Sequence, residues 1–384
     1  MTPLAEIIRG EIAMAGGRVP FARFMELALY HPEHGYYLAP ERRPGRGGDF
    51  LTAPEASAYF GLTLARQVAE CWQRLGRPDP FDVREYGAGT GVLAYDVLAG
   101  LSEEEHRLLD AVRYRLVEPN PHRRAEALAA MEEVGLGDRV VAEDLADELE
   151  PITGVVLANE VADALPVHRL VGRADGFGER WVVVDPAGGG FVWEDGPLSP
   201  GGERAADELR ASGITPEPGA VYDASPAAAD WFGAACQSID RGYAIVVDYG
   251  YPARELYRDH RLAGTLRAYA GHAVTDDVLA DPGERDLTAH VDLTALERAG
   301  GRAGMTPAGL TTQGALLASL GLGDRLVALQ RDPDTTLTDY LSAQAVVLRL
   351  IDPGGLGRFR VLLMAKGAPV DPPLLGLREK PPAF

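Results

Sequence analysis

The stretch Glu85-Tyr86-Gly87-Ala88-Gly89-Thr90-Gly91 lies where an expected strand, Asp82–Tyr86, runs into an expected helix, Gly91–Gly100. Glycines let the backbone turn tightly and approach a ligand closely, and the first turn of the helix presents unpaired N–H groups. We therefore expect a cofactor-binding turn with Glu85, Gly87, Gly89 and Gly91 as its residues. A structural turn with chance glycines is the alternative, since the chain holds 45 glycines.

A second acid strengthens the first reading. The expected strand Tyr114–Glu118 ends in a carboxylate 27 residues beyond Gly91. An acid at this place in a Rossmann unit accepts hydrogen bonds from ribose hydroxyls. The acid-x-Gly-x-Gly-x-Gly spacing differs from the dinucleotide form, and S-adenosylmethionine, which has no pyrophosphate, fits it. Asp144, after the next strand, is expected to meet the adenine amino group, or else to cap a helix.

Alternating strands and helices from Phe81 onward indicate a parallel α/β sheet. Further strands are expected at Arg139–Ala142, Gly154–Asn159, Tyr243–Asp248 and Phe359–Lys366. Short antiparallel strands are expected between residues 165 and 218, where Gly-rich turns separate apolar segments.

A candidate active centre follows the strand Gly154–Asn159. Ligands in open α/β sheets bind at the carboxyl ends of strands, so Asn159, Glu160 and Asp163 are expected beside the methyl acceptor. Glu160 and Asp163 project to one side if the turn between them is helical; a capping pair is the alternative. His168 is a candidate general base, or a hydrogen-bonded structural residue.

Composition excludes several classes of protein. The formal net charge is −20, which disfavours binding to a nucleic-acid backbone. No apolar run approaches the roughly 20 residues of a membrane span. The two cysteines, Cys71 and Cys236, form no CxxC pair, so neither a disulfide framework nor a metal site is expected. A cytoplasmic location is expected.

The chain resembles the MidA-like (DUF185) family, which includes a mitochondrial protein-arginine methyltransferase acting in complex I assembly. The resemblance covers nearly the whole chain. One departure is Val161-Ala162, where the family usually has two aromatic residues. The markers, in order, are Tyr30-His31-Pro32, Gly48-Asp49-Phe50, Thr52, Pro54-Glu55, the glycine loop, Asn159-Glu160, Asp163–His168, Asp248-Tyr249-Gly250, Thr265–Arg267 and Asp286–Asp292.

The resemblance implies a class I S-adenosylmethionine-dependent methyltransferase with a Rossmann-like sheet, a helical N-terminal extension and two insertions. The expected parts are a helical region with a cofactor-covering loop (1–80), the methyltransferase core (81–165, 219–250 and 355–367), a β-rich insertion (166–218), and a loop-rich and helical acceptor-side region (251–354).

The resemblance also implies that Glu160 and Asp163 orient an arginine guanidinium of a protein substrate. Thr52 and Glu55 belong to a loop, Asp49–Glu55, expected to fold over the cofactor; a plain connection is the alternative. Three other functions stay open: methylation of a small molecule, an assembly factor that binds S-adenosylmethionine without turnover, and, more distantly, a nicotinamide dehydrogenase. The sequence leaves the oligomeric state open.

Overall fold

The computed structural model describes residues 2–39, 52–144, 149–258, 261–270 and 273–378. The chain forms two compact units. The sheet unit comprises residues 51–160, 234–249 and 300–384, and the N-terminal unit comprises residues 1–50, 161–233 and 250–299. The expected helical region 1–80 is thus divided between them after residue 50. Residues 49–51 of the expected covering loop lie outside the described residues.

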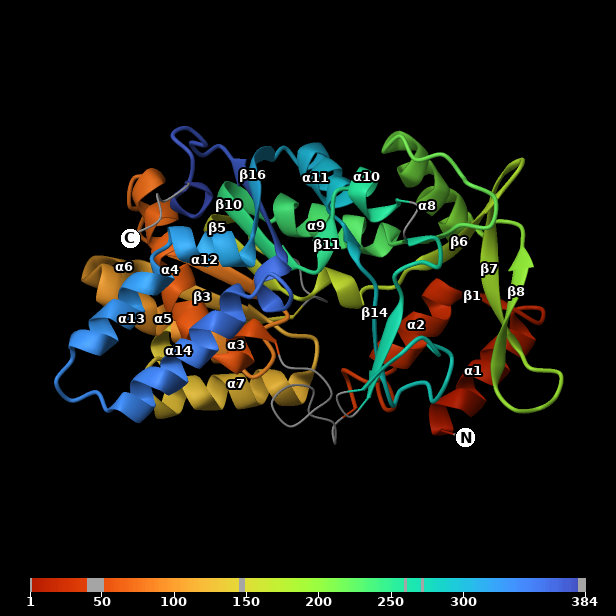
Figure 1. The fold of residues 1–384 in the computed structure, drawn as a ribbon, viewed down its shortest axis with the longest axis horizontal. Coiled ribbons are helices and arrows are strands. Elements are labelled where there is room, and N and C mark those ends of the chain that lie inside the picture. The colour runs from red at the N-terminus through yellow and green to blue at the C-terminus, as the bar shows by residue number, and fades with distance from the viewer. Residues whose placement is uncertain (1, 40–51, 145–148, 259–260, 271–272, 379–384) are drawn as a thin grey trace. The chain divides into compact units, whose positions relative to one another are not determined.

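The sheet unit is built on one seven-stranded sheet with the order β16-β17-β10-β5-β2-β3-β4 (Figure 1). Strands β4 to β10 along this order run parallel, whereas β17 is antiparallel to both β10 and β16. The strand order reverses between β2 and β5, which is where open α/β sheets bind ligands. The strands are β2 (Phe81–Tyr86), β3 (Val112–Val117), β4 (Val140–Glu143), β5 (Ile152–Asn159), β10 (Ile239–Asp248), β16 (Thr306–Thr312) and β17 (Arg360–Lys366).

Two glycines allow close packing of α4 on α5 in this unit. A Cβ at Gly61 would lie 2.4 Å from Cβ of Asp96, and one at Gly100 would lie 2.6 Å from Cβ of Ala65.

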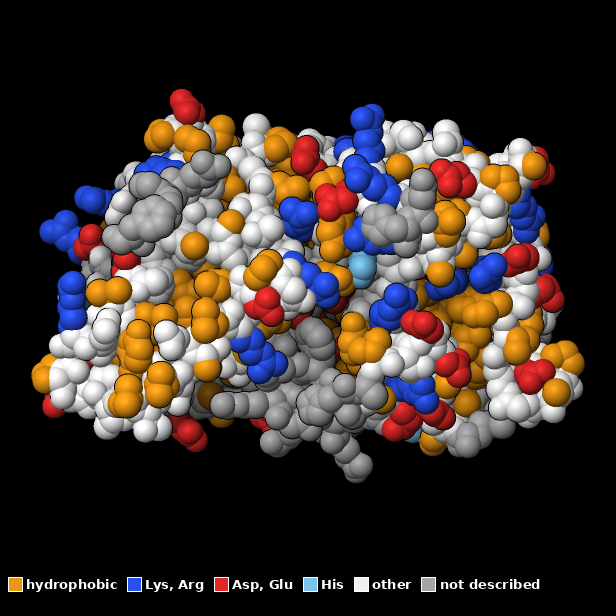
Figure 2. Space-filling model, viewed as in Figure 1, with side chains coloured by type: hydrophobic (Ala, Val, Ile, Leu, Met, Phe, Trp, Pro, Cys, Tyr) orange, Lys and Arg blue, Asp and Glu red, His pale blue; other side chains and the backbone are white. Residues whose placement is uncertain are grey.

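Hydrophobic side chains are exposed on α13 and α14 (Figure 2), Leu337 and Leu348 among them. The helices are α3 (Ala53–Ala56), α4 (Ala58–Arg74), α5 (Val92–Glu104), α6 (His106–Ala111), α7 (Pro121–Glu133), α12 (Gln313–Ser319), α13 (Leu322–Arg331) and α14 (Leu337–Ile351).

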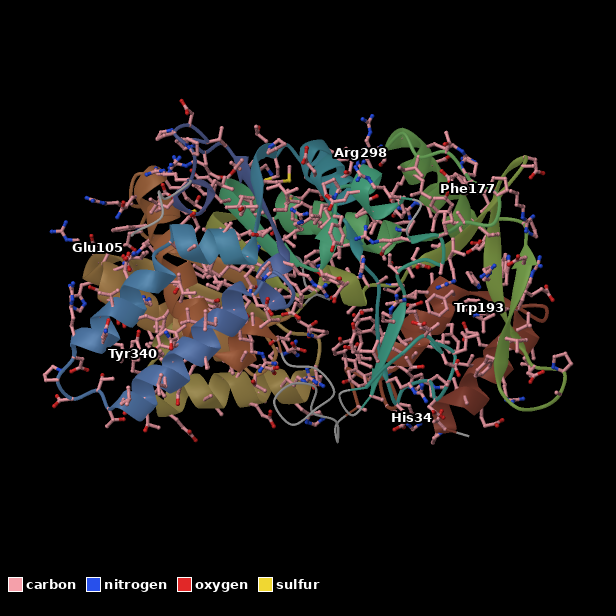
Figure 3. All side chains as sticks on the ribbon, viewed as in Figure 1. His34, Glu105, Phe177, Trp193, Arg298 and Tyr340 are labelled. Carbon is pink, nitrogen blue, oxygen red and sulfur yellow. The ribbon has the colours of Figure 1, made fainter. Side chains whose placement is uncertain are left out.

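The N-terminal unit holds a five-stranded antiparallel sheet, β1-β7-β6-β9, with β8 paired to β7. Trp193 of β8, labelled in Figure 3, packs on Phe21 of α2 with 5.2 Å between ring centroids. This contact belongs to the unit's apolar core. Its elements are α1 (Pro3–Met14), β1 (Val19–Pro20), α2 (Phe21–Tyr30), β6 (His168–Arg173), β7 (Gly176–Val184), β8 (Phe191–Gly196), α8 (Pro200–Ala211) and β9 (Val221–Ala224).

Shorter elements complete this unit. A three-stranded sheet has the order β13-β12-β14, and β11 pairs with β15. Helices α9 and α11 each run from this unit into the sheet unit. The elements are the 3-10 helix η2 (Ala162–Ala164), α9 (Pro226–Gln237), β11 (Gly250–Tyr251), α10 (Ala253–Leu256), β12 (Arg267–Ala270), β13 (Ala273–Thr275), β14 (Asp286–Thr288), β15 (Val291–Asp292) and α11 (Leu293–Arg302).

The predicted strands of the sheet are confirmed to within two residues, apart from the start of Tyr243–Asp248, which begins at Ile239. The elements that were not predicted include the strand β16 and the helices α8 and α11. Residues 313–331 form two helices, α12 and α13, because Gly321 between them has a φ of 87°. Within the described residues no helix is long and apolar enough to cross a bilayer.

Candidate functional site

The glycine loop joins β2 to α5 with three left-handed residues. Gly87, Gly89 and Gly91 have φ angles of 70°, 55° and 80°, which side chains with a Cβ rarely adopt. A Cβ on Gly89 would meet no atom within 4 Å, whereas one on Gly91 would lie 3.0 Å from Cβ of Ala127. Gly89 therefore leaves open space beside the loop, and Gly91 also permits packing against α7.

Glu118, directly after β3, fixes this loop. Its Oε2 accepts a hydrogen bond from the N–H of Gly89, and its Oε1 accepts one from the N–H of Asn120, both at 2.8 Å. The residue is buried, and burial raises the pKa of its carboxyl. Each carboxylate oxygen has a second lone pair, so Glu118 can still accept hydrogen bonds from a diol.

Glu85 lies inside the sheet, where Tyr114 of β3 donates a hydrogen bond to its Oε2 at 2.7 Å. Burial raises the pKa of Glu85 to about 8, and the negative charge of Glu118 adds to this increase. Tyr114, which the sequence did not single out, thus joins two strands behind the glycine loop. The contacts described for Glu85 are internal to the protein.

Asp144 follows β4 with a half-exposed side chain. Its carboxylate forms an ion pair with Arg124 of α7 at 3.1 Å. Arg124 also donates a hydrogen bond to the main-chain oxygen of Glu118 at 3.3 Å. Asp144 is therefore connected through one arginine to the residue that holds the glycine loop.

Asn159 and Glu160 follow the adjacent strand β5. The Asn159 Nδ2 donates a hydrogen bond to Oε1 of Glu160 at 2.9 Å, and the N–H of Ala53 donates to the same oxygen at 3.3 Å. Among the described residues, Oε2 of Glu160 and Oδ1 of Asn159 are buried without a hydrogen-bond partner. Glu160 has a φ of 54°, an uncommon conformation outside glycine that often marks a functional site.

The protonation of Glu160 is also unusual. Burial raises its pKa to about 8; the hydrogen bond from Asn159 opposes this, and the charges of Asp248 and Glu55 add to it. Asp248 closes β10, and the main-chain oxygen of Val247 in the same strand accepts a hydrogen bond from the N–H of Glu160 at 2.8 Å. The sequence showed Asp248 only as a family marker, although its place at the end of the neighbouring strand was a usable signal.

Glu55 belongs to α3, the helix whose first N–H reaches Glu160, and Thr52 is the N-cap of this helix. The N–H of Thr52 donates a hydrogen bond to Oε2 of Glu55 at 3.4 Å, as in a capping box. This short helix therefore presents Ala53 to the Glu160 carboxyl and brings the charge of Glu55 near it.

Asp163 and His168 belong to the N-terminal unit. The helical turn on which Glu160 and Asp163 were to share a side does not form, because Glu160 is left-handed and η2 starts only at Ala162. The main-chain oxygen of Asp163 accepts a hydrogen bond from Ala289 at 2.9 Å.

His168 begins β6, where its Nδ1 lies 2.7 Å from Oε1 of Glu179. Glu179 is fully buried, and its Oε2 also accepts the N–H of Ser199 at 2.6 Å. This arrangement favours the structural alternative for His168. No cluster of metal-binding side chains occurs in the described parts of the chain.

The arrangement in the sheet unit fits S-adenosylmethionine. The open space at Gly89 and the remaining lone pairs of Glu118 suit an adenosine with a ribose diol.

Comparisons with known proteins agree with this site. Residues 63–311, more than half of the chain, match the model of a family described as putative S-adenosyl-L-methionine-dependent methyltransferase. A COG1565 superfamily protein from Burkholderia thailandensis, solved with bound S-adenosyl-homocysteine, has 36% sequence identity and a TM-score of 0.85; the match covers 97% of this chain and 94% of that one. The chain therefore has the α/β methyltransferase fold, with a mixed sheet and flanking helices.

Curated relatives carry a more specific name. The mouse (Mus musculus) protein arginine methyltransferase NDUFAF7, mitochondrial, is 30% identical over 355 residues, covering 86% of this chain and 76% of the relative. The Drosophila melanogaster homolog is 29% identical over 400 residues, covering 95% and 85%. Because these relatives are named as mitochondrial, they contradict the expectation of a cytoplasmic protein. The family match and the bound product in the related structure together lead to one conclusion: this chain belongs to the S-adenosyl-L-methionine-dependent methyltransferases of that family, and S-adenosylmethionine is its cofactor.

Proposed function

We propose that this enzyme methylates a nitrogen of an arginine side chain in a protein. The observation that carries the proposal is the Glu160 carboxyl after β5, whose buried Oε2 has no hydrogen-bond partner among the described residues. A guanidinium presents N–H groups in a fork that matches a carboxylate. The names of the curated relatives support arginine as the acceptor.

Glu160 has two tasks in this proposal. Its Oε2 orients the guanidinium, whose nitrogen is a poor nucleophile because its lone pair is delocalised. The same oxygen takes the proton that the nitrogen loses as the new N–C bond forms. A pKa of about 8 suits a general base that works near neutral pH. When bound, S-adenosylmethionine supplies an electrophilic methyl group, and its sulfur keeps the electron pair of the broken S–C bond.

The proposed cofactor site uses the residues around the glycine loop. Glu118 accepts hydrogen bonds from the ribose hydroxyls, and Gly87, Gly89 and Gly91 let the loop approach the ligand. Glu85 keeps the loop in place through its hydrogen bond with Tyr114, whose hydroxyl donates to the Glu85 carboxyl at 2.7 Å. The half-exposed Asp144 is assigned to the adenine amino group.

The other residues that the sequence assigned to the site have smaller roles in this proposal. Thr52 and Glu55 contribute through α3, which reaches Glu160 by the N–H of Ala53. Asp163 stays a candidate for the acceptor side, while His168 is given a structural role beside Glu179. The sheet is proposed to be Rossmann-like, because its order reverses between β2 and β5, with the segments of the N-terminal unit as insertions.

The test is transfer of tritiated methyl from S-adenosylmethionine to the proteome of a strain that lacks this gene. Wild-type enzyme is expected to label protein, and Glu160→Gln is expected to lose the label while binding S-adenosylmethionine with unchanged affinity. The matched control is Asp230→Asn, because Asp230 is an exposed residue whose side chain forms an ion pair with Arg204. Label confined to metabolites would show a small-molecule methyltransferase, and full labelling by Glu160→Gln would remove Glu160 from the mechanism.

A further inference from the structure

In the side-chain amide of Asn159, the nitrogen has a hydrogen-bond partner and the oxygen has none among the described residues. Its Nδ2 donates to Oε1 of Glu160 at 2.9 Å. Its Oδ1 is buried and, among the described residues, accepts no hydrogen bond. A buried acceptor without a donor costs about 1 to 3 kcal/mol and needs an explanation in a folded protein.

A second unsatisfied acceptor is carried by the next residue. Oε2 of Glu160 is buried and, within the described chain, equally without a donor, while its Oε1 has two. One N–H of Nδ2 is engaged with Oε1, and the buried atoms of the two side chains that have no partner within the described chain are both acceptors. Two neighbouring acceptors at the carboxyl end of a strand point to a ligand that brings N–H donors.

The backbone supports a functional reason for this arrangement. Glu160 keeps a φ of 54°, and a non-glycine residue in this region costs on the order of 1 kcal/mol. The N–H of Glu160 is bonded to the oxygen of Val247 at 2.8 Å, which fixes the strained turn to β10. Backbone strain at Glu160 therefore coincides with two buried oxygens, on Asn159 and Glu160, that have no hydrogen-bond donor within the described residues.

We infer that Asn159 contacts the methyl acceptor directly, with Oδ1 accepting one N–H of the substrate beside the N–H bound by Oε2 of Glu160. The same amide orients Glu160 through Nδ2, so one side chain both positions the carboxyl and binds substrate. This assignment rests on the proposed nitrogen methylation. It makes the two-residue clamp, Asn159 and Glu160, selective for acceptors that present two N–H groups over hydroxyls, which present one.

The charges around the clamp suit a cationic acceptor. Asp248 of β10 and Glu55 of α3 both raise the pKa of Glu160, so their carboxylates lie close enough to act on it. A guanidinium entering the clamp would compensate these negative charges.

The clamp is tested with small probes, without turnover. Guanidinium chloride and tetramethylammonium chloride are titrated by calorimetry into the full-length enzyme saturated with S-adenosylhomocysteine, at pH 8.5. Guanidinium has N–H donors and tetramethylammonium has none, although both are cations. Wild type is expected to bind guanidinium at least about ten times more tightly than tetramethylammonium, the loss expected when hydrogen bonds to a charged partner are missing.

Variants separate contact from positioning. Asn159→Leu removes both amide groups and is expected to weaken guanidinium binding about tenfold, with S-adenosylhomocysteine affinity unchanged. Asn159→Asp keeps an oxygen at Oδ1 but loses the Nδ2 donor that orients Glu160, so guanidinium binding should be weaker than in wild type and stronger than in Asn159→Leu. Asp230→Asn, a change at an exposed ion pair, serves as the control variant. Equal binding of the two cations, or an Asn159→Asp as weak as Asn159→Leu, overturns the inference. Labelling of metabolites alone would instead refute the arginine substrate and leave the clamp standing.

Discussion

The carboxylate of Glu118 accepts a hydrogen bond from the N–H of Gly89 at 2.8 Å, so the acid that follows β3 holds the turn that follows β2. Two neighbouring parallel strands are thereby joined at their carboxyl ends. This contact connects the shape of the glycine loop to a residue that can also bind the cofactor.

Replacing Glu118 should therefore weaken cofactor binding strongly. Glu118→Ala is expected to lower the affinity for S-adenosylmethionine about 10- to 100-fold, since it removes hydrogen bonds to a charged group. Glu118→Gln keeps one carbonyl oxygen and should lose less. Isothermal titration calorimetry measures both. An affinity of Glu118→Ala equal to wild type would mean that Glu118 only shapes the loop.

The positive φ of Glu160 predicts that the stability of variants at this position depends on whether the new residue tolerates a left-handed backbone. Glu160→Gly should be more stable than Glu160→Ala by about 1 kcal/mol, because glycine adopts a positive φ without strain. Both variants should be inactive, since both lack the carboxyl. Urea unfolding monitored by circular dichroism gives the difference. Equal stabilities would show that the positive φ carries no strain.

Activity should depend on pH through Glu160. Its carboxyl is active when deprotonated, and burial raises its pKa to about 8. In the free enzyme, kcat/KM should therefore rise between pH 6 and about 8 and level off above that value. The measurement is the initial rate of methyl transfer to the labelled protein across this range. A rate that is flat from pH 6 to 9 speaks against Glu160 as the base.

His168 should matter for stability and not for chemistry. It lies 2.7 Å from the fully buried Glu179, and removing one partner of a buried pair costs about 3 to 5 kcal/mol. His168→Gln, if it folds, is expected to lose much of that stability while kcat stays within about threefold of wild type. A large loss of kcat with unchanged unfolding would restore His168 as a general base.

Local patterns in the sequence were enough to predict the central sheet and its glycine loop. Gly87, Gly89 and Gly91 could be assigned to a tight turn between a strand and a helix, because such turns need positive φ angles, which glycine adopts without strain. The strand β16 was missed because it contains Pro307 and Gly309, which usually mark turns; the register of its pairing with β17 shifts between these two residues. Helix α8 was missed for a similar reason, since it starts with Pro200-Gly201-Gly202 after the cap Ser199.

The candidate site was only partly predictable. Asn159 and Glu160 could be placed at a strand end, but the φ of Glu160 depends on its contacts with β10 and α3, which are distant in sequence. The expected grouping of Glu160 with Asp163 relied on a helical turn that this φ prevents. The partner Tyr114 is defined by a tertiary contact with Glu85 and leaves no distinct pattern in the sequence.

The most direct test of the central claim is amino-acid analysis of the protein that the enzyme labels with tritiated methyl. After acid hydrolysis, the account predicts that the label runs with methylated arginine in the wild-type reaction and is absent with Glu160→Gln. Label in another methylated residue, or an equal yield of methylated arginine from Glu160→Gln, would contradict it.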